Sequence, residues 1–258
     1  MNRKDVFGDR MKSYESLRTQ YLMPNLPIMI RLDGKCFHSY CRGLSGGKKP
    51  YDARLMGLMQ DTMVIVAKEA NATCAYTQSD EITLALIPKP YDPVTRKVSE
   101  LFFNGRVSKI ESTIAGLASA YFSTQAVYRI PERANRLAVF DCRAWNVPSI
   151  EEAANTILWR EMDATKNSIQ MLTRANFSQK EMYGKGQAAM HEMLYTKGIN
   201  WNDEIAAFKR GSFCIDGVVS SLPSLRSITN RAQVLFEGAA PTSQCSVKES
   251  VPTTDNTH

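Results

Sequence analysis

Two acidic stretches with small neighbours are the first sign of chemistry in this sequence. Asp33 and Gly34 end the apolar run "IMIRLDG", and Asp80 and Glu81 fall in the polar step of "YTQSDEITLAL". Carboxylates held close together repel one another, and hard divalent cations with oxygen ligands, above all Mg²⁺, relieve that repulsion. These residue types indicate a Mg²⁺ site that handles phosphate, provided that the fold brings the two stretches together.

Each stretch also has a simpler interpretation. Asp-Gly is a common turn pair, and Ser-Asp-Glu is typical of an exposed hairpin tip. Taken singly, each fits an ordinary turn better than a ligand site. Their shared place at the ends of neighbouring strands is what favours a functional site.

Basic residues close to these stretches add phosphate-binding character, because phosphoryl transfer depends mainly on positioning and charge neutralisation. Lys35 and His38 follow the first aspartate, and the loop "GGKKPYD" supplies Lys49 and Asp52. Arg106 and Lys109 are expected at the start of a helix, where the helix dipole disfavours cations unless an anion binds. A solvated basic linker and a partly buried histidine remain the alternatives.

A second polar group follows later in the chain. Arg160, Asp163 and Asn167 are spaced i, i+3 and i+7 on one helix face, with Lys166 beside them. A solvated helix face is the alternative here. Lys209 and Arg210 form a short basic step before a possible last strand.

The elements that must position these groups can be read from hydrophobic periodicity. Alternation over residues 26–33 predicts a strand, and the helical spacing of apolar residues from Tyr51 onward predicts a helix. Two short strands around a tight turn predict a hairpin over 73–88. A second helix around 110–121 and a fourth strand at 136–145 complete the order β-α-β-β-α-β. This order predicts an α+β, ferredoxin-type two-layer sandwich with helices on one face of a mainly antiparallel sheet.

The remainder of the chain reads as mainly helical. Capping-box spacing at Ser149–Glu152 and at Ser178–Glu181 predicts helix starts, and Gly198 predicts a helix stop. Residues after 238 are rich in Ser, Thr and Pro, with little to bury. We therefore divide the chain into a catalytic region at 1–148, a helical section at 149–215 that completes the same unit, and a C-terminal extension at 216–258, disordered from about residue 238.

Composition limits the class of protein. The 258 residues are 43% hydrophobic, enough for a substantial core, and the net charge of +6 with a pI near 9.0 favours a polyanionic partner. The six cysteines contain no CxxC pair and the three histidines are scattered, which argues against a zinc site and for a reducing compartment. Without a signal peptide or a long apolar run, we expect a cytoplasmic protein with no membrane contact.

Several motifs, in order and spacing, resemble those of the tRNA-His guanylyltransferase superfamily, which extends RNA in the 3′-to-5′ direction. The resemblance covers about residues 5 to 215 and excludes the tail. The paired D-G-x-x-F-H and Q-S-D-E motifs are specific together. The matching stretches are "RLDGKCFHSY", "KKPYD", "YTQSDEITLAL", "GRVSKI", "FDCRAW" and "WREMDATKNSI".

This resemblance implies a palm-like catalytic region with two Mg²⁺ ions held by Asp33, the Gly34 carbonyl and Asp80, with Glu81 as a supporting acid. Members activate a tRNA 5′-monophosphate with ATP and release pyrophosphate. The 3′-hydroxyl of an incoming nucleoside triphosphate such as GTP then attacks, and AMP leaves. Asp52 would orient its loop. The groups implied in triphosphate binding are the backbone of Gly34, Lys35, Cys36, Phe37 and His38, with the side chains of Lys35, His38, Lys49, Ser79 and Lys109.

One departure separates subfamilies. Eukaryotic members carry a His-Ile-Asn-Asn stretch linked to recognition of tRNA-His, whereas this chain has Thr165-Lys166-Asn167-Ser168, similar to the bacterial, archaeal and phage-type members. Those members resemble repair enzymes that restore missing 5′ nucleotides on truncated tRNA, using the opposite strand as template. The candidate RNA-binding residues are Arg160, Lys166, Asn167, Lys209 and Arg210.

Template-directed repair is therefore the favoured function, with guanylate addition to tRNA-His as the alternative. Two further alternatives are a palm-type nucleotide cyclase and a tRNA-binding protein that has lost catalysis. The resemblance also implies a homotetramer built as a dimer of dimers.

Overall fold

The computed structural model describes residues 6–44, 50–89 and 101–237. The order β1-α3-β2-β3-α4-β4 is the predicted β-α-β-β-α-β arrangement, so the α+β fold class is confirmed. In chain order the elements are α1 (Val6–Ser16), β1 (Ile28–Gly34), α2 (Phe37–Cys41), α3 (Ala53–Glu69), β2 (Cys74–Gln78), β3 (Glu81–Leu86), η1 (Phe102–Gly105), α4 (Val107–Arg129), η2 (Pro131–Arg133), β4 (Phe140–Asn146), α5 (Ile150–Arg174), α6 (Gln179–Met182), α7 (Gln187–Thr196), η3 (Trp201–Asp203), α8 (Ala206–Arg210), β5 (Ser212–Ile215), β6 (Val218–Ser220), η4 (Leu225–Ser227) and α9 (Arg231–Phe236).

The strands form one antiparallel sheet in the order β4-β1-β3-β2-β5-β6. β1 lies between β4 and β3, and its register pairs Asp33 with Glu81 on β3 and with Asp141 on β4. The possible last strand after Arg210 is present as β5, which pairs with β2. The sheet therefore carries three carboxylates side by side at one end.

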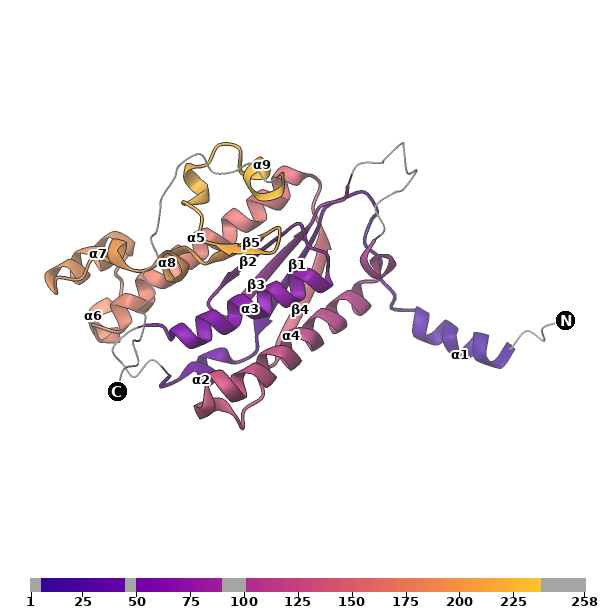
Figure 1. Cartoon of the computed structure of the whole chain (residues 1–258), viewed down its shortest axis with the longest axis horizontal. Helices are drawn as coiled ribbons and strands as arrows, with labels where there is room; N and C mark the ends of the chain where they lie inside the picture. Colours follow the sequence, from indigo (N-terminus) through magenta and orange to yellow (C-terminus); the bar gives the residue numbers. More distant parts are fainter. Residues whose placement is uncertain (1–5, 45–49, 90–100, 238–258) are drawn as a thin grey trace, which may run out of the picture.

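Two long helices, α3 and α4, cover one face of the sheet (Figure 1). Successive side chains of a strand point to opposite faces. Ile28, Ile30 and Leu32 of β1 therefore enter the core on this side, where they join Met63 of α3 and Phe122 of α4. The alternation in the sequence predicted this layer correctly.

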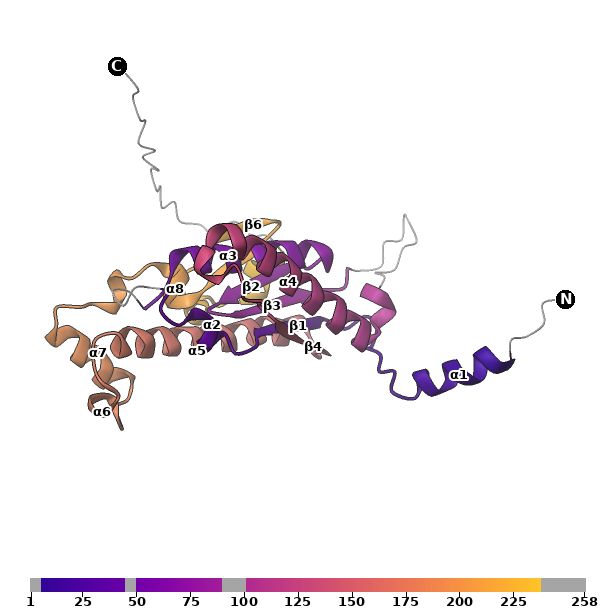
Figure 2. The same ribbon diagram turned by 90° about the horizontal axis from the view of Figure 1, so that it is seen from below.

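The long helix α5 covers the opposite face, so that the sheet lies between helices on both sides (Figure 2). Met29 of β1 points to this side and shares a core with Tyr76 of β2 and Ile157 of α5. The sequence predicted a helical section after the sandwich but not the face that it covers.

Residues after 215 add to the second layer. β6 pairs with β5 across a turn that contains Gly217, and Leu225 and Leu235 are fully buried beside α5. The division that we place at residue 216 thus falls within a hairpin. Residues 238–258, for which we expect disorder, lie outside the described residues.

The helical section is more broken than the sequence indicates. The capping box of Ser178 and Glu181 is present, but it begins only the four-residue helix α6. Gly184 then adopts φ 71°, a left-handed conformation that ends the helix, and α7 begins afresh at Gln187. Gly198 ends α7 as predicted, since the Ile199 N–H donates to the Leu194 carbonyl in a Schellman arrangement.

Helix α1 points away from the body of the molecule in both views and buries none of its residues. Among the described residues, no helix combines the length and apolar character needed to cross a membrane.

Candidate active site

Asp33 and Asp80 lie at the same end of the sheet, although they come from separate strands. Asp33 pairs with Glu81 across β1 and β3, and Asp80 lies in the tight turn before β3. The Gly34 N–H donates a 3.0 Å hydrogen bond to the Asp80 carbonyl. This bond fixes the two acidic stretches side by side.

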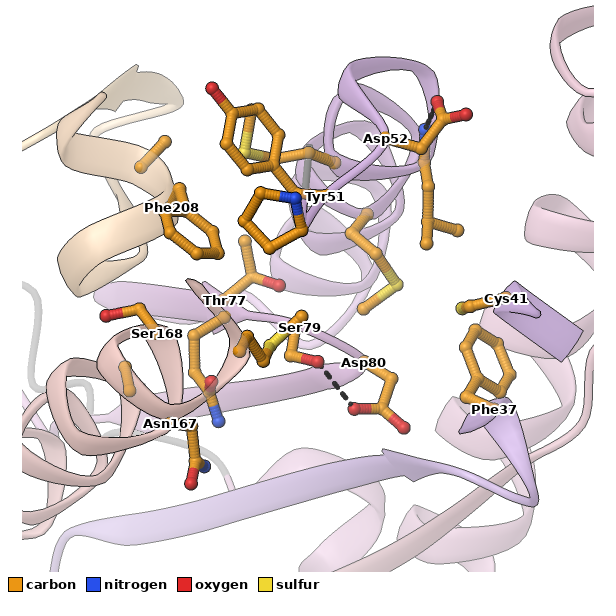
Figure 3. A pocket seen from close by; sticks show the side chains of 18 of the residues that line it. Phe37, Cys41, Tyr51, Asp52, Thr77, Ser79, Asp80, Asn167, Ser168 and Phe208 are labelled. Atoms are coloured by element: carbon orange, nitrogen blue, oxygen red, sulfur yellow. Dashed lines mark hydrogen bonds between the residues drawn. The ribbon is translucent and has the colours of Figure 1, made fainter. Parts of the chain in front are cut away.

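The electrostatics of this end match two carboxylates that repel each other. Burial raises the pKa of the Asp80 carboxyl, and the negative charge of Asp33 raises it further. The Ser79 hydroxyl donates a 3.0 Å hydrogen bond to Asp80 and opposes the rise (Figure 3). A cation between the two carboxylates would remove the repulsion.

The donor set fits Mg²⁺ better than a metal enclosed by protein ligands. Within the described ranges, no three His, Cys, Asp or Glu side chains are grouped to hold a metal. Mg²⁺ is usually bound by one or two carboxylates with substrate phosphates and water completing the shell. Asp33 and Asp80, with the backbone carbonyl of Gly34, are oxygen donors of this kind.

Glu81 has a different environment from the two aspartates. Its carboxylate accepts hydrogen bonds of 2.6 and 2.7 Å from the Arg160 guanidinium of α5, and both residues are buried. Burial raises the pKa of Glu81, whereas Arg160 opposes this rise. Glu81 therefore ties the strand after Asp80 to α5.

A pocket of about 420 Å³ opens beside Asp80 and lies between α2, α3 and α5. One wall is polar and includes His38, Ser79 and Asp80. The opposite wall carries Tyr51 and Phe208, whose ring centroids are 4.6 Å apart (Figure 3). This size and mixture of aromatic and polar groups are typical of small-molecule sites.

The turn between β1 and α2 is shaped by its residues. Cys36 adopts a left-handed conformation with φ 57°, which turns the chain directly into α2. Phe37 is buried against Tyr40, Phe122 and Phe140 and so anchors the helix on the core. The side chain of Phe37 thus packs on the core, and the residue also lines the pocket beside Asp80.

Replacing Gly34 with alanine should disrupt this turn. An added Cβ would lie 2.4 Å from the Phe37 ring, closer than real contacts allow. We expect Gly34→Ala to lower the free energy of unfolding in urea by about 1–3 kcal/mol, typical of overpacking. Gly57→Ala in α3 is the matched control, because a Cβ there meets nothing within 4 Å and should be neutral or stabilising. Equal stability of the two variants would contradict this account.

Asp52 fixes the start of α3 at the rim of the pocket. Its carboxylate caps the helix by accepting hydrogen bonds from the Arg54 and Leu55 N–H groups. The Arg54 side chain pairs with Asp52 and also with Glu132, and its hydrogen bond lowers the pKa of Asp52. Asp52 therefore caps α3 and holds the Arg54 side chain at the rim of the pocket.

Comparisons with known proteins agree with this geometry. The family model described as tRNAHis guanylyltransferase matches residues 8–148. The chain belongs to this family. It is 32% identical over 221 residues to the tRNA(His) guanylyltransferase of Schizosaccharomyces pombe, a match that spans 80% of this chain and 78% of the relative. Membership makes the chain a tRNA nucleotidyltransferase.

Solved structures of the tRNAHis guanylyltransferase family share the fold. A bacterial tRNA(His) guanylyltransferase-like protein in complex with ATP is 36% identical with a TM-score of 0.73, over 81% of this chain and 86% of that one. Its complex with GTP gives 34% identity and a TM-score of 0.67, over 82% and 84%. The Saccharomyces cerevisiae enzyme, 21% identical with a TM-score of 0.69 over 83% and 96%, shares the fold alone.

Not every residue implied by family membership lies at the pocket. Lys109 is in the first turn of α4, with its ammonium 4.8 Å from the Phe103 ring. The site end of α4 is instead marked by Phe122, which contacts Phe37. Phe122 lies thirteen positions after Lys109, which is about 20 Å of helix. Within one chain, the structure does not bring Lys109 to Asp33. Lys49 lies outside the described residues.

The candidate RNA-binding residues divide into two sets. Arg160 and Lys209 are buried: Arg160 binds Glu81, and the Lys209 ammonium donates to the Asn202 carbonyl. These two cations are therefore engaged within the protein. Lys166 and Arg210 line a second pocket on α5, whereas Asn167 lines the first.

Some pocket residues were not predicted from the sequence. Tyr51 lies within the quoted stretch "KKPYD" and could have been singled out as an aromatic beside Asp52. Phe208 and Arg174 gave no such signal, because they reach the pocket only through the packing of α8 and α5.

Proposed function

We propose that this chain is a Mg²⁺-dependent enzyme that adds nucleotides in the 3′-to-5′ direction to the 5′ end of truncated tRNA, guided by the opposite strand. The observation that carries the proposal is that Asp80, which lines a nucleotide-sized pocket, is held beside Asp33 by the hydrogen bond from the Gly34 N–H to the Asp80 carbonyl. Family membership supports nucleotidyl transfer on tRNA. We further propose that the function is repair of truncated tRNA and that the metal ion is Mg²⁺.

The metal would be held by Asp33, Asp80 and the Gly34 carbonyl oxygen. When bound, two Mg²⁺ ions supply charge neutralisation and an activated hydroxyl. The chain contributes the preformed carboxylate pair, fixed by the bond from the Gly34 N–H to Asp80. The raised pKa of Asp80 means that metal must compete with a proton, so Mg²⁺ affinity should fall as the pH drops.

The nucleotide would occupy the pocket with its base against Tyr51 and Phe208. ATP and GTP are the ligands of the bacterial relatives, which supports this assignment. The Gly34 and Lys35 N–H groups already donate to Asp80 and Val139. Triphosphate contacts from the backbone are therefore narrowed to the amides of residues 36–38, with the side chains of Lys35, His38 and Ser79 and, outside the described residues, Lys49.

The reaction would proceed in two steps. A 5′-phosphate oxygen of the RNA attacks the α-phosphorus of ATP, a P–O bond forms, and pyrophosphate leaves. The 3′-hydroxyl of the incoming nucleoside triphosphate then attacks the RNA phosphorus and AMP leaves. In both steps the basic residues around the pocket offset the charge of the phosphates.

The segment Thr165–Ser168 supports repair over selective recognition of tRNA-His. Asn167 donates a 3.2 Å hydrogen bond to Asp163, and Ser168 is buried, donating to the Thr165 and Lys209 carbonyls. The Ser168 side chain is thus used within the fold, and that of Asn167 is held by Asp163 at the wall of the pocket beside Asp80. The names of the curated relatives favour the alternative, guanylate addition to tRNA-His.

A panel of 5′-truncated tRNAs separates the two functions. Each tRNA, tRNA-His included, is incubated with ATP, Mg²⁺ and one of the four nucleoside triphosphates. Repair predicts extension of every tRNA by the nucleotide complementary to the opposite base, and a changed product when that base is changed. Guanylate added to tRNA-His alone, whatever the opposite base, would contradict repair.

A further inference from the structure

A second pocket, of about 480 Å³, lies along α5. Its lining comes from α5, α7, η3, α8 and the segment around η4, and it is separate from the pocket at Asp80. The lining includes Trp159, Lys166, Trp201, Arg210 and Arg226.

Two indoles and three cations dominate this second pocket, which we call the groove. Trp159 is 53% exposed, although it is a large aromatic residue. Its acidic neighbours are already engaged: Glu161 accepts a 2.8 Å hydrogen bond from the Leu225 N–H, and Asp163 accepts from Arg160. The Nε of Arg210 is buried without a hydrogen-bond partner in the described part of the chain. Because Asp163 is paired with Arg160, the three cations face one remaining acid, Glu161, and the groove keeps a net positive charge for an anionic ligand.

The groove begins beside the catalytic carboxylates. The Trp159 ring lies 4.5 Å from the Arg160 guanidinium carbon and 5.7 Å from that of Arg31. Arg31 precedes Asp33 by two positions on β1, so both side chains are on the same face of the sheet. Trp159 therefore lies on the face of the sheet that carries Asp33.

The second indole lies further along α5. The Trp201 N–H donates a 3.1 Å hydrogen bond to the Ser168 hydroxyl. Ser168 lies nine positions after Trp159, about 13 Å along the helix axis.

We propose that this groove binds the single-stranded 3′ segment of the RNA whose 5′ end is extended. The proposal rests on the proposed function, because the strand opposite a bound 5′ end must leave the site beside Asp33. Single-stranded RNA offers unstacked bases to aromatic side chains and phosphates to cations. An A-form duplex keeps its bases stacked and could not use the two indoles.

Binding of two RNA hairpins tests the proposal. They share one duplex and a fluorophore in the loop, but only one carries a single-stranded 3′ overhang. Anisotropy is measured in EDTA without nucleotides, so that no extension occurs. We expect wild type to prefer the overhang hairpin. Trp159→Ala should lose about five- to hundredfold in affinity for that hairpin, the usual effect of removing one stacking aromatic, and keep its affinity for the blunt one.

Control variants separate stacking from general damage. Trp159→Phe should keep most of the preference, and Tyr128→Ala removes an even more exposed aromatic from α4 and should change nothing. Arg226→Ala should weaken overhang binding, unlike Lys68→Ala on α3. Equal affinity of wild type for both hairpins, or an equal loss on both by Trp159→Ala, would overturn the proposal. If the proposed function were wrong, neither hairpin would be extended at its 5′ end when Mg²⁺ and nucleotides are supplied. This result is distinct from the outcome of the binding assay.

Discussion

Asp80→Asn should lower the rate of nucleotide addition at least about a hundredfold while the protein stays folded. A metal site contributes several kcal/mol to the transition state, and each 1.36 kcal/mol is a factor of ten in rate. Burial and the charge of Asp33 raise the pKa of Asp80, so the ionised carboxylate disfavours the folded state. Wild type therefore loses stability as the pH rises through this pKa, and the variant should not.

The matched control is Asp141→Asn. Asp141 also pairs with Asp33 across the sheet, but its side chain is 55% exposed and lies near Arg143. We expect it to keep a rate near that of wild type. Rates of 5′ extension and urea unfolding at neutral pH measure both properties. Near-normal extension by Asp80→Asn, or an equal loss in Asp141→Asn, would refute the assignment of Asp80.

Arg160→Met should be the most destabilising of these substitutions. It leaves the Glu81 carboxylate buried without its cation, and breaking a buried ion pair in this way costs about 3–5 kcal/mol. The physical reason is desolvation, because Glu81 keeps only 7% of its surface exposed. Urea denaturation gives the loss directly.

A double variant shows whether the uncompensated charge is the cause. Glu81→Leu with Arg160→Met replaces the pair by apolar side chains, an exchange that is often neutral or stabilising. We expect it to recover most of the stability lost by Arg160→Met alone. A double variant as unstable as the single one would mean that packing around Arg160, and not the charge of Glu81, sets the stability.

The sequence was sufficient to predict that the carboxylates lie together at one end of the sheet. Alternating apolar residues predicted β1, and the polar step at Ser79 and Asp80 predicted the hairpin turn. Since antiparallel neighbours place the end of one strand beside the start of the next, Asp33 and Asp80 could be placed together without coordinates.

Chain direction explains why Lys109 could not be placed from its charge. β3 runs away from Asp80, so the helix that follows begins at the far end of the sheet and returns toward the site. The cationic first turn of α4 therefore faces away from the pocket. The direction of the strands, and not the helix dipole at Lys109, determines where this lysine lies relative to the site.

Long-range packing set the remaining features of the site. The ion pair of Glu81 with Arg160 depends on α5 crossing the second face of the sheet, and no local pattern indicates which face a later helix covers. The contact of Tyr51 with Phe208 likewise joins segments that are distant in the sequence. Such contacts are fixed by the complementarity of whole layers, which periodicity alone does not contain.

The direction of synthesis is the most direct test of the central claim. A 5′-truncated tRNA whose 3′ terminus has been oxidised with periodate, so that it cannot be extended, is incubated with the wild-type protein, ATP, labelled GTP and Mg²⁺. Extension from the 5′ end predicts that label enters this RNA as well as it enters an unblocked one, and that Asp80→Asn abolishes it. Label that enters only when the 3′-hydroxyl is free would contradict the account.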